Sequence, residues 1–349
     1  MSRLDEVFAL VSVDSSSGHE AALASEVEGR LRRAYALDVE RVGDNVVART
    51  RGGGGRRLLV AGHLDTVPGD VTRARRLDDR VRGVGACDMK GSLAIMIELA
   101  LDSGPRSSEV TWVFYAREEI ARADSGLMEI FRRRPELLAA DAAVVAEPTG
   151  GVVEAGCQGT MRVVVELRGT RAHTARPSTG RNALHRLGVL LARVASYESR
   201  TAVIDGVTYH EQLQAVRAHA GIADNVVPDS ASCTLNYRVA PDHSRDDAVA
   251  ALRDVLGDTV DPEDEVRVVD WAPPAPPNLS DPLLQRLVSV SQAPVRAKVG
   301  WTDVATFAEW GVPSANFGAG NPELAHHHDE FVTSDELDEF ARVLERWLA

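Results

Sequence analysis

The sequence predicts an α/β fold with a mainly parallel sheet, helices on both of its faces, and a smaller α+β domain inserted into the chain. First, the chain has 349 residues, which is too long for one small core and favours two domains. Second, helix and strand patterns alternate in the first part, as they do in parallel sheets. Third, after Cys157 the order changes to β-α-β-β-α-β, which is typical of a ferredoxin-like domain.

The first part begins with two amphipathic helices. Apolar residues follow helical spacing at Leu4, Val7, Phe8 and Val11, and again at Leu23, Val27 and Leu31. Apolar runs then predict strands at NVVART (45–50), RRLLVAGHLDTV (56–67), EVTWVFYA (109–116) and DAAVVAE (141–147). The run GSLAIMIELAL (91–101) between them predicts a buried helix. This alternation indicates the parallel sheet.

The inserted segment contains four predicted strands and two predicted helices. The strands are 160–169, 211–222, 230–240 and 265–271, and the helices are 181–195 and 244–257. In the first of these helices we expect one packed side, formed by Leu184, Leu187, Leu191 and Val194. The segment ends at APPAPP (272–277), whose prolines make a stiff linker.

The remainder of the chain returns to helix and strand and ends in an amphipathic helix. Its apolar residues are Leu337, Phe340, Ala341, Leu344, Trp347 and Leu348. Thr333 and Glu336 form a plausible capping box at its start. We therefore expect three segments: 1–158 and 272–349 form the larger domain, and 159–271 forms the inserted one.

Composition and charge exclude several classes of protein. A net charge of −13 argues against a nucleic-acid binder, which needs clustered Lys and Arg. No apolar stretch reaches about 18 residues, so we expect no membrane span. Three widely spaced cysteines indicate neither a disulfide framework nor a cysteine zinc site. The first residues lack a signal-peptide layout, so we expect a cytoplasmic protein.

Polar residues follow several of the predicted buried strands, where open α/β sheets place their ligand sites. The motifs are GHLDTV with His63 and Asp65, GVGACDMKG with Asp88, AREE with Glu118 and Glu119, AEPT with Glu147, and LAHHHDEF with three successive histidines at 326–328. Each motif alone is more often ordinary surface. Together, as a set of only histidines and carboxylates, they predict hard or borderline divalent metals.

This set of residues predicts hydrolytic chemistry. Two histidines and three carboxylates are enough to hold two zinc ions with one bridging ligand and an open position for water. A further carboxylate can serve as general base. On an extended strand His63 and Asp65 share a face, which suits a common site. Spacing alone does not choose among the three histidines, because His326 and His328 face one way and His327 the other if the segment is extended.

The motifs in this order resemble the co-catalytic zinc aminoacylase and carboxypeptidase family. The resemblance covers nearly the whole chain and includes AHTARPSTGRNA in the inserted domain. Within that family, four stretches are similar to the Gram-positive type of succinyl-diaminopimelate desuccinylase: EPTGGVVEAGCQGTMRVVV, IDGVTY, GWTDVATF and NFGAGNPELAH. The resemblance implies a zinc-peptidase-like catalytic domain and an inserted domain that makes a homodimer.

The resemblance also implies a role for each motif residue. His63 and Glu147 would bind one Zn²⁺, Glu119 and His326 would bind the other, and Asp88 would bridge them, with Co²⁺ as a possible substitute. Asp65 would steady the His63 side, and Glu118 would be the general base. The family motif places the ligand at His326, because Ala325 precedes it and Asp329 and Glu330 follow.

Residues of the inserted domain would complete the site. His173 would reach the partner subunit's site and help to bind the oxyanion, while Asn225, Arg238 and Thr302 match positions that resemble substrate contacts. A purely structural role for Arg238 in its strand is an equal alternative. The substrate would be a small N-acyl amino acid, with no nucleic acid or membrane partner.

The reaction implied by this resemblance converts N-succinyl-LL-2,6-diaminopimelate to succinate and LL-2,6-diaminopimelate, a step of lysine biosynthesis. Two departures from the pattern bear on the substrate: Thr306 stands where arginine is expected, and RPSTGRNA (176–183) is less aromatic. A paralogous deacylase or dipeptidase is therefore an alternative. A non-catalytic, metal-stabilised binding dimer is disfavoured because Glu118 and all five ligand positions are present.

Overall fold

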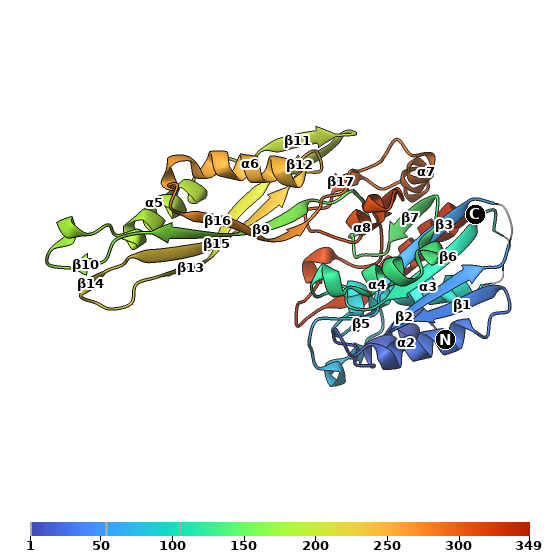
Figure 1. Cartoon of the computed structure of the whole chain (residues 1–349). Helices are drawn as coiled ribbons and strands as arrows, with labels where there is room; N and C mark the ends of the chain where they lie inside the picture. The colour runs from blue at the N-terminus through green and yellow to red at the C-terminus, as the bar shows by residue number, and fades with distance from the viewer. Residues whose placement is uncertain (1, 53–54, 103, 105) are drawn as a thin grey trace. The chain divides into compact units, whose positions relative to one another are not determined.

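The computed structural model describes residues 2–52, 55–102, 104 and 106–349, which form two compact units (Figure 1). The larger unit comprises Met1–Gly156, Pro277–Arg296 and Thr306–Ala349, and the smaller comprises Cys157–Pro276 and Ala297–Ala305. The domain limits predicted from the sequence, at 158/159 and 271/272, remain a proposal beside these units.

An eight-stranded sheet forms the centre of the larger unit. Its order is β1-β2-β6-β3-β7-β18-β8-β17. The strands are β1 (Leu37–Val42), β2 (Asn45–Thr50), β3 (Arg57–His63), β6 (Glu109–Tyr115), β7 (Ala142–Val145), β8 (Val153–Ala155), β17 (Val295–Ala297) and β18 (Ser314–Asn316). The four inner strands β6, β3, β7 and β18 pair in parallel, whereas β1, β2 and β8 pair antiparallel. The predicted mainly parallel α/β sheet is confirmed.

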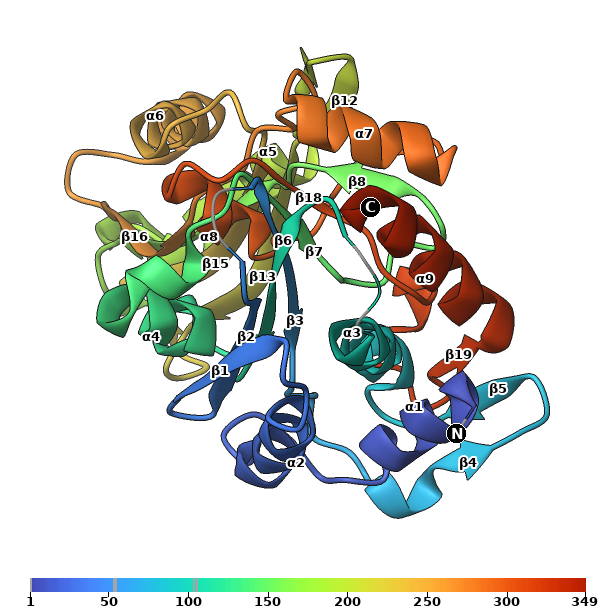
Figure 2. The ribbon, with the colours of Figure 1, turned by 90° about the vertical axis from the view of Figure 1, so that its right-hand side faces the viewer.

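Helices cover both faces of this sheet, with α3 and α9 on one face and α4 on the other (Figure 2). The helices are α1 (Arg3–Val11), α2 (Ala21–Leu31), α3 (Gly91–Leu101), α4 (Gly126–Arg133), α7 (Pro282–Ser291), α8 (Val304–Glu309) and α9 (Ser334–Leu348). Helix α3 is apolar nearly all round and buries nine of its residues, as a helix within a core must. The predicted capping box at Thr333 and Glu336 begins α9.

The glycine immediately before His63 favours close packing of η2 and α3 against β3. A Cβ at Gly62 would lie 2.6 Å from Cε of Met89 and 2.9 Å from Cδ2 of Leu93. A Cβ there would force these two buried side chains to shift within a close-packed interior. The small residue therefore lets the helix lie against the strand that presents His63.

A second, three-stranded sheet and several short helical turns complete the larger unit. The sheet has the order β19-β5-β4, with β4 (Arg75–Arg76), β5 (Arg80–Arg82) and β19 (Phe331–Thr333). The turns that matter for the site are η1 (Val71–Arg73), η2 (Ala86–Lys90), η3 (Arg122–Asp124) and η7 (Pro322–Leu324). Among the residues that the structure describes, no helix combines the length and apolarity needed to cross a membrane.

The smaller unit contains a four-stranded antiparallel sheet of order β13-β15-β9-β16. Its elements are β9 (Gly159–Arg168), α5 (Ala183–Ala195), β13 (Gln212–Ala220), β15 (Ser230–Val239), α6 (Arg245–Leu256) and β16 (Glu265–Ala272). This order and the two helices agree with the predicted ferredoxin-like pattern. Two pairs of short strands that the sequence did not predict are β10 (Ala172–His173) with β14 (Val226–Val227) and β11 (Thr201–Ile204) with β12 (Val207–His210).

One predicted packing face is partly wrong. Helix α5 buries Ala183, Leu187, Leu190 and Val194, whereas Leu184 is 46% exposed. The sequence has apolar residues on more than one side of this helix, so helical spacing alone was compatible with two overlapping buried faces. Packing against the sheet and α6 selected the one that contains Leu190.

Candidate metal centre

The inner parallel strands of the larger unit bring three of the predicted motifs to one edge of the sheet. His63 is the last residue of β3, Glu118 and Glu119 follow the end of β6, and Glu147 follows the end of β7. Because β3 pairs in parallel with both β6 and β7, these ends lie side by side. Parallel pairing thus gathers residues that are far apart in the sequence at the carboxyl edge, where open α/β sheets bind ligands.

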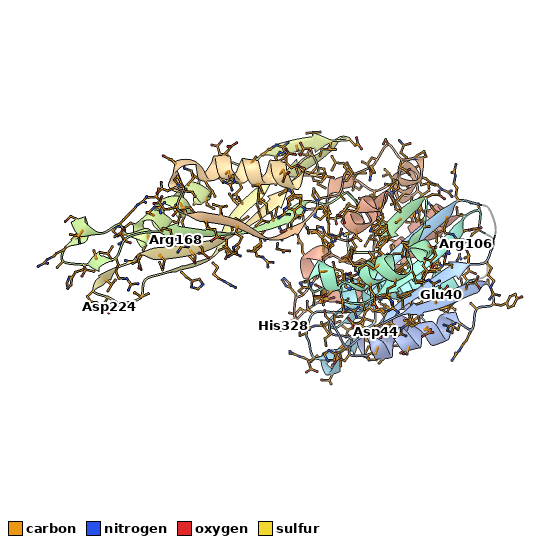
Figure 3. The ribbon with its side chains drawn as sticks, in the orientation of Figure 1. Glu40, Asp44, Arg106, Arg168, Asp224 and His328 are labelled. Atoms are coloured by element: carbon orange, nitrogen blue, oxygen red, sulfur yellow. The ribbon has the colours of Figure 1, made fainter. Side chains whose placement is uncertain are left out.

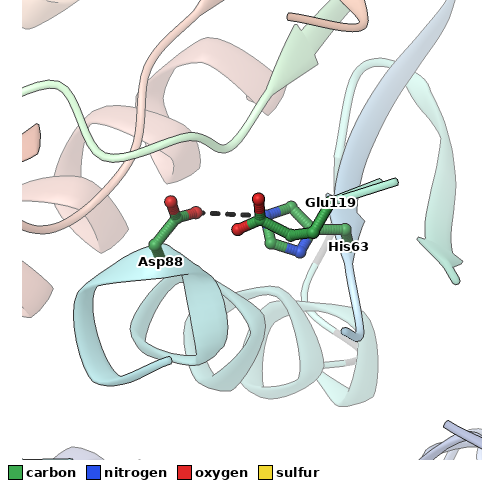
Figure 4. A group of neighbouring side chains, drawn as sticks. All are labelled: His63, Asp88 and Glu119. Carbon is green, nitrogen blue, oxygen red and sulfur yellow. Dashed lines mark hydrogen bonds and ion pairs between the residues drawn. The ribbon is translucent and has the colours of Figure 1, made fainter. Parts of the chain in front are cut away.

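Asp88 lies between two histidines, on the turn η2 that precedes α3. Its Oδ1 lies 3.0 Å from Nε2 of His63, and its Oδ2 lies 3.5 Å from Nε2 of His326. Figure 4 shows Asp88 and His63 pointing toward each other, with Glu119 beside them. Each oxygen of a single carboxylate thus faces a different histidine, which is the geometry of a bridging ligand.

A second carboxylate accompanies each histidine. Oε1 of Glu147 lies 4.0 Å from Nε2 of His63, and Oε1 of Glu119 lies 2.8 Å from Nε2 of His326. Ligand atoms of His63, Asp88 and Glu119 all lie within 4.8 Å of one another. The five residues therefore form two groups, each with one histidine and one carboxylate, that share Asp88.

The electrostatics of this cluster favour positive charge. Burial alone would lower the pKa of His63, but its hydrogen bonds with Asp65 and Asp88 outweigh burial and raise the pKa well above its usual value. Hydrogen bonds with Asp88 and Glu119 raise the pKa of His326 to about 10. Burial opposes ionisation of Asp88, yet the two histidines hold the pKa of that carboxyl below its usual range. The carboxylates that retain protons on these histidines would equally hold divalent cations.

Asp65 holds residues of the cluster in position through hydrogen bonds. We expected His63 and Asp65 to share a face of one strand. The strand β3 ends at His63, so Asp65 lies beyond it and this expectation is wrong. Instead, Nδ1 of His63 lies 2.9 Å from the main-chain oxygen of Asp65, and its Nε2 faces Asp88. The Asp65 carboxylate accepts the main-chain N–H groups of Glu118 and Glu119 at 2.9 and 3.1 Å. Asp65 thus orients one histidine and fixes the loop that carries both glutamates.

Glu330 is a supporting residue to which the sequence assigned no role. It is buried, and its carboxylate accepts the main-chain N–H groups of Gly85, Cys87 and Asp88 at 3.1, 2.8 and 2.8 Å. These three bonds hold the turn that presents Asp88. The only sequence signal was its place in the histidine-rich motif, which does not indicate three main-chain donors some 240 residues earlier.

Only His326 of the three successive histidines reaches the cluster within the described part of the chain. Its backbone is left-handed, with φ of 65°, which turns the chain between η7 and β19. His327 and His328 are exposed, and His328 is labelled on this loop in Figure 3. The geometry therefore agrees with the choice of His326 that the motif predicted.

The remaining predicted residues lie in the smaller unit. His173 in β10 pairs with Val226 in β14, and the N–H of Thr174 donates to the oxygen of Asn225 at 3.1 Å. Asp224, next to Asn225, is labelled at this end of the unit in Figure 3. His173 and Asn225 are thus neighbours.

Arg238 and Thr302 are not part of that pair. Arg238 lies near the opposite end of β15, where burial lowers its pKa. Thr302 is buried, and its main-chain oxygen lies 3.7 Å from Sγ of Cys157. The fold of the smaller unit therefore separates these two residues from the end that carries His173.

Thr306, which departs from the expected arginine, still has a guanidinium beside it. Nε of Arg122 lies 3.3 Å from Oγ1 of Thr306, and Arg122 also pairs with Glu309. Arg122 belongs to η3, three residues after Glu119. A positive charge thus contacts position 306, although another segment supplies it.

The donor set fits two borderline divalent cations. Imidazole nitrogens and carboxylate oxygens suit zinc, and one shared carboxylate with two terminal groups leaves room for water and a substrate oxygen. Glu118 immediately precedes Glu119 on the same loop and provides a carboxylate beyond the five ligand candidates. Such an arrangement can polarise a carbonyl and supply a proton acceptor beside it.

The chain is similar in sequence to known proteins over nearly its whole length. The sequence profile of Peptidase family M20/M25/M40 matches residues 59–349. A Mycobacterium tuberculosis protein provisionally named succinyl-diaminopimelate desuccinylase DapE is 46% identical over 344 residues, covering 97% of this chain and 96% of that one. The succinyl-diaminopimelate desuccinylase of Corynebacterium glutamicum is 39% identical over 349 residues, covering 97% and 94%.

Solved structures match the fold. A tripeptidase from Staphylococcus aureus has a TM-score of 0.82 at 20% identity, covering 99% of this chain and 96% of that one. A dinuclear metal-binding peptidase of the M20 family from Bacillus subtilis has a TM-score of 0.75 at 15% identity, covering 99% and 96%. At such low identity these structures establish the architecture alone.

Proposed function

Because the chain belongs to peptidase family M20/M25/M40, we propose that it is a metal-dependent amidohydrolase that converts N-succinyl-LL-2,6-diaminopimelate to succinate and LL-2,6-diaminopimelate. The observation that carries the hydrolytic assignment is the position of Asp88, with one carboxylate oxygen toward each of two histidines. The succinyl substrate is supported by identities of 46% and 39% over nearly the whole chain to proteins with that name.

We propose that the centre holds two Zn²⁺ ions, for which Co²⁺ can substitute. His63 and Glu147 would ligate one ion, Glu119 and His326 the other, and Asp88 both. Metal ions bound there would polarise the amide carbonyl and make a water molecule more acidic. Cations bound there would compensate the carboxylates of this partly buried site, in which ionised groups without compensating charge are unfavourable.

The chain's own residues would carry the proton. Glu118 would accept a proton from the attacking water as its oxygen forms a bond with the amide carbon. The same carboxyl would donate that proton to the leaving nitrogen as the C–N bond breaks, so the reaction consumes one water and releases an acid and an amine. Asp65 would hold Glu118 in place through the hydrogen bond to its main-chain N–H.

The smaller unit would complete the site in a homodimer. His173 of one subunit would donate a hydrogen bond to the developing oxyanion in the partner's site, and Asn225, which neighbours His173, would contact substrate beside it. Arg238 and Thr302 are the other proposed substrate contacts. The cytoplasmic location expected from the first residues of the sequence stays a prediction. All three cysteines are free and buried.

The proposal is tested by metal analysis together with amine release from three matched substrates. We expect two metals per subunit and preferred hydrolysis of N-succinyl-LL-2,6-diaminopimelate over N-acetyl-LL-2,6-diaminopimelate and over a dipeptide. Preference for either of the other substrates would point to a paralogous deacylase or dipeptidase. Two bound metals with no hydrolysis of any amide would contradict the enzymatic assignment.

The dimer is tested by a His173→Ala variant. Loss of one oxyanion donor should lower kcat about 10²–10³-fold while metal content stays normal. Mixing this variant with Glu118→Gln should restore part of the activity, because one composite site then has both intact groups. Verified subunit exchange without recovery would show that His173 does not serve the partner's site.

A further inference from the structure

A cavity of about 400 Å³ in the larger unit adjoins the candidate metal centre. One wall is formed by His326, His327 and His328, and the other by parts of the segment between residues 67 and 84. His326 therefore faces Asp88 and Glu119 with Nε2 and also lines this cavity. A molecule bound in the cavity could contact His326, whose ring also faces the proposed metal ligands.

The cavity is positively charged, although the chain as a whole carries −13. Arg73, Arg75 and Arg82 line it, and Asp70 is the one acidic residue of its described lining. The Asp70 carboxylate accepts the N–H and hydroxyl of Thr72, as expected for the cap of η1. Arg82 is paired with Asp329 outside the lining, so three guanidiniums against two carboxylates leave a net charge of +1 before the histidines are counted.

The adjacent arginines of β4 face in different directions. Arg75 lines the cavity, whereas Arg76 does not and instead pairs with Asp5 at 3.3 Å. Alternate residues of a strand point to opposite sides, which accounts for this difference. Nη1 of Arg75 donates to the main-chain oxygens of Thr72 and Ala74 at 2.9 and 2.7 Å. These bonds orient the guanidinium without neutralising it.

We propose that this cavity binds a carboxylate of the substrate through Arg73 and Arg75 and so selects N-acyl amino acids with a carboxylate distant from the scissile amide. The inference rests on the proposed function and names the part of the substrate that this side of the site receives. Guanidinium groups match a carboxylate in charge and in donor geometry. N-succinyl-LL-2,6-diaminopimelate has two such carboxylates, one on the acyl group and one at the far end of the diacid.

Arg82 has a different role within the cavity. It pairs with Asp329, which links β5 to the loop that carries the three histidines. Its charge is therefore partly compensated, and its removal would disturb the loop next to His326. Arg73 and Arg75, for which no carboxylate pair exists among the described residues, are the positions to alter.

The test is the double variant Arg73→Gln/Arg75→Gln, with Arg76→Gln as a matched control on the same strand. Exposed ion pairs each contribute up to about fivefold in affinity, so we expect KM for N-succinyl-LL-2,6-diaminopimelate to rise about 10-fold. We expect kcat, metal content and Tm to be unchanged. Arg75→Lys, which keeps the charge, should retain most of the affinity that Arg75→Gln loses. The control should keep its KM.

Ionic strength provides an independent measurement. Between about 0.01 M and about 1 M ionic strength the Debye length falls from about 30 Å to about 3 Å. Wild-type KM should rise across this range, and the double variant should lose most of that dependence. An unchanged KM and an unchanged salt dependence in the double variant would overturn the inference.

Two further substrates identify the carboxylate. N-acetyl-LL-2,6-diaminopimelate lacks the acyl carboxylate, and Nα-succinyl-lysine lacks the far one. If the double variant raises KM only for substrates with the acyl carboxylate, the cavity receives the succinyl end; the reverse result assigns the far end. If wild type hydrolyses these substrates and the double variant has the same KM values, the proposed role of the cavity is wrong but the proposed function stands. No wild-type turnover of any of the three, with two metals bound, overturns the proposed function and the inference with it.

Discussion

Two clusters of histidine and carboxylate occur in the described part of the chain, and they differ in what neutralises the acids. In the larger unit, the Asp88 carboxylate pairs with His63 and His326. In the smaller unit, Glu211, Asp242 and His243 also place their ligand atoms within 4.8 Å of one another. By composition alone, either cluster could hold a metal ion.

In the second cluster, the Glu211 carboxylate already has several partners within the protein. Oε1 of the buried Glu211 accepts the N–H of Ala240 at 2.9 Å and lies 3.2 Å from both Nη1 of Arg200 and Nδ1 of His243. Its Oε2 accepts the hydroxyl of Tyr237 at 2.6 Å. Arg200 also pairs with Asp242.

A metal site and an ion-pair network differ in the groups that compensate their carboxylates. A fixed guanidinium supplies the positive charge in the Glu211 cluster, so a cation would have to displace it. In the Asp88 cluster, among the described residues, two histidines and no guanidinium pair with Asp88, and metal ions can replace the protons of those histidines. A metal site is therefore recognised by the cations and hydrogen-bond donors around the ligands as well as by the ligand types.

The sharpest test of this comparison is His326→Ala. Removing the histidine that faces Glu119 and Asp88 should remove one metal or weaken it strongly, and activity should be lost. His327→Ala and His328→Ala are matched controls on the same loop and should keep two metals per subunit by elemental analysis. Full occupancy in His326→Ala, with a metal lost from either control, would show that the wrong histidine was assigned.

The second test separates metal binding from catalysis in the same centre. Glu118→Gln is nearly isosteric but cannot accept a proton, so kcat should fall by at least about 10²–10⁴-fold. Metal content should remain at two per subunit, because Glu118 is not among the proposed ligands. Wild-type kcat in this variant would refute the general-base assignment.

The third test uses pH. Because the pKa of His326 is raised to about 10 and that of His63 is also raised, the metal-free site is protonated at neutral pH. Metal binding must displace these protons, so apparent affinity should rise with pH and fall about tenfold per pH unit for each proton displaced on acidification. Calorimetric titration of the metal-free protein in buffers of different ionisation enthalpy measures the released protons. A pH-independent affinity between about pH 6 and about pH 8 would contradict this picture.

The smallest expected effect is that of Glu211→Gln. The amide leaves Arg200 and the Tyr237 hydroxyl poorly paired, so the free energy of unfolding should fall by about 1–3 kcal/mol. Metal content should not change, because this cluster holds no ion in our interpretation. Loss of a metal from Glu211→Gln, measured beside wild type, would remove the distinction between the two clusters.

Local patterns in the sequence were sufficient for much of the architecture. Helical spacing predicted α1, α2 and α9, and Thr333 with Glu336 predicted the start of α9. Apolar runs predicted β3, β6 and β7, and the motifs after them predicted the candidate ligands. These features depend on residues within a few positions of one another, so the chain specifies them before any long-range contact exists.

Tertiary structure decided which of these residues meet. Parallel pairing of β3 with β6 and β7 brought His63 near Glu119 and Glu147, and the turn held by Glu330 aimed one oxygen of Asp88 at each histidine. The burial of Leu190 instead of Leu184 and the network around Glu211 likewise depend on packing between segments. Burial, charge pairing and orientation are set by neighbours distant in sequence, and spacing along the chain does not encode them.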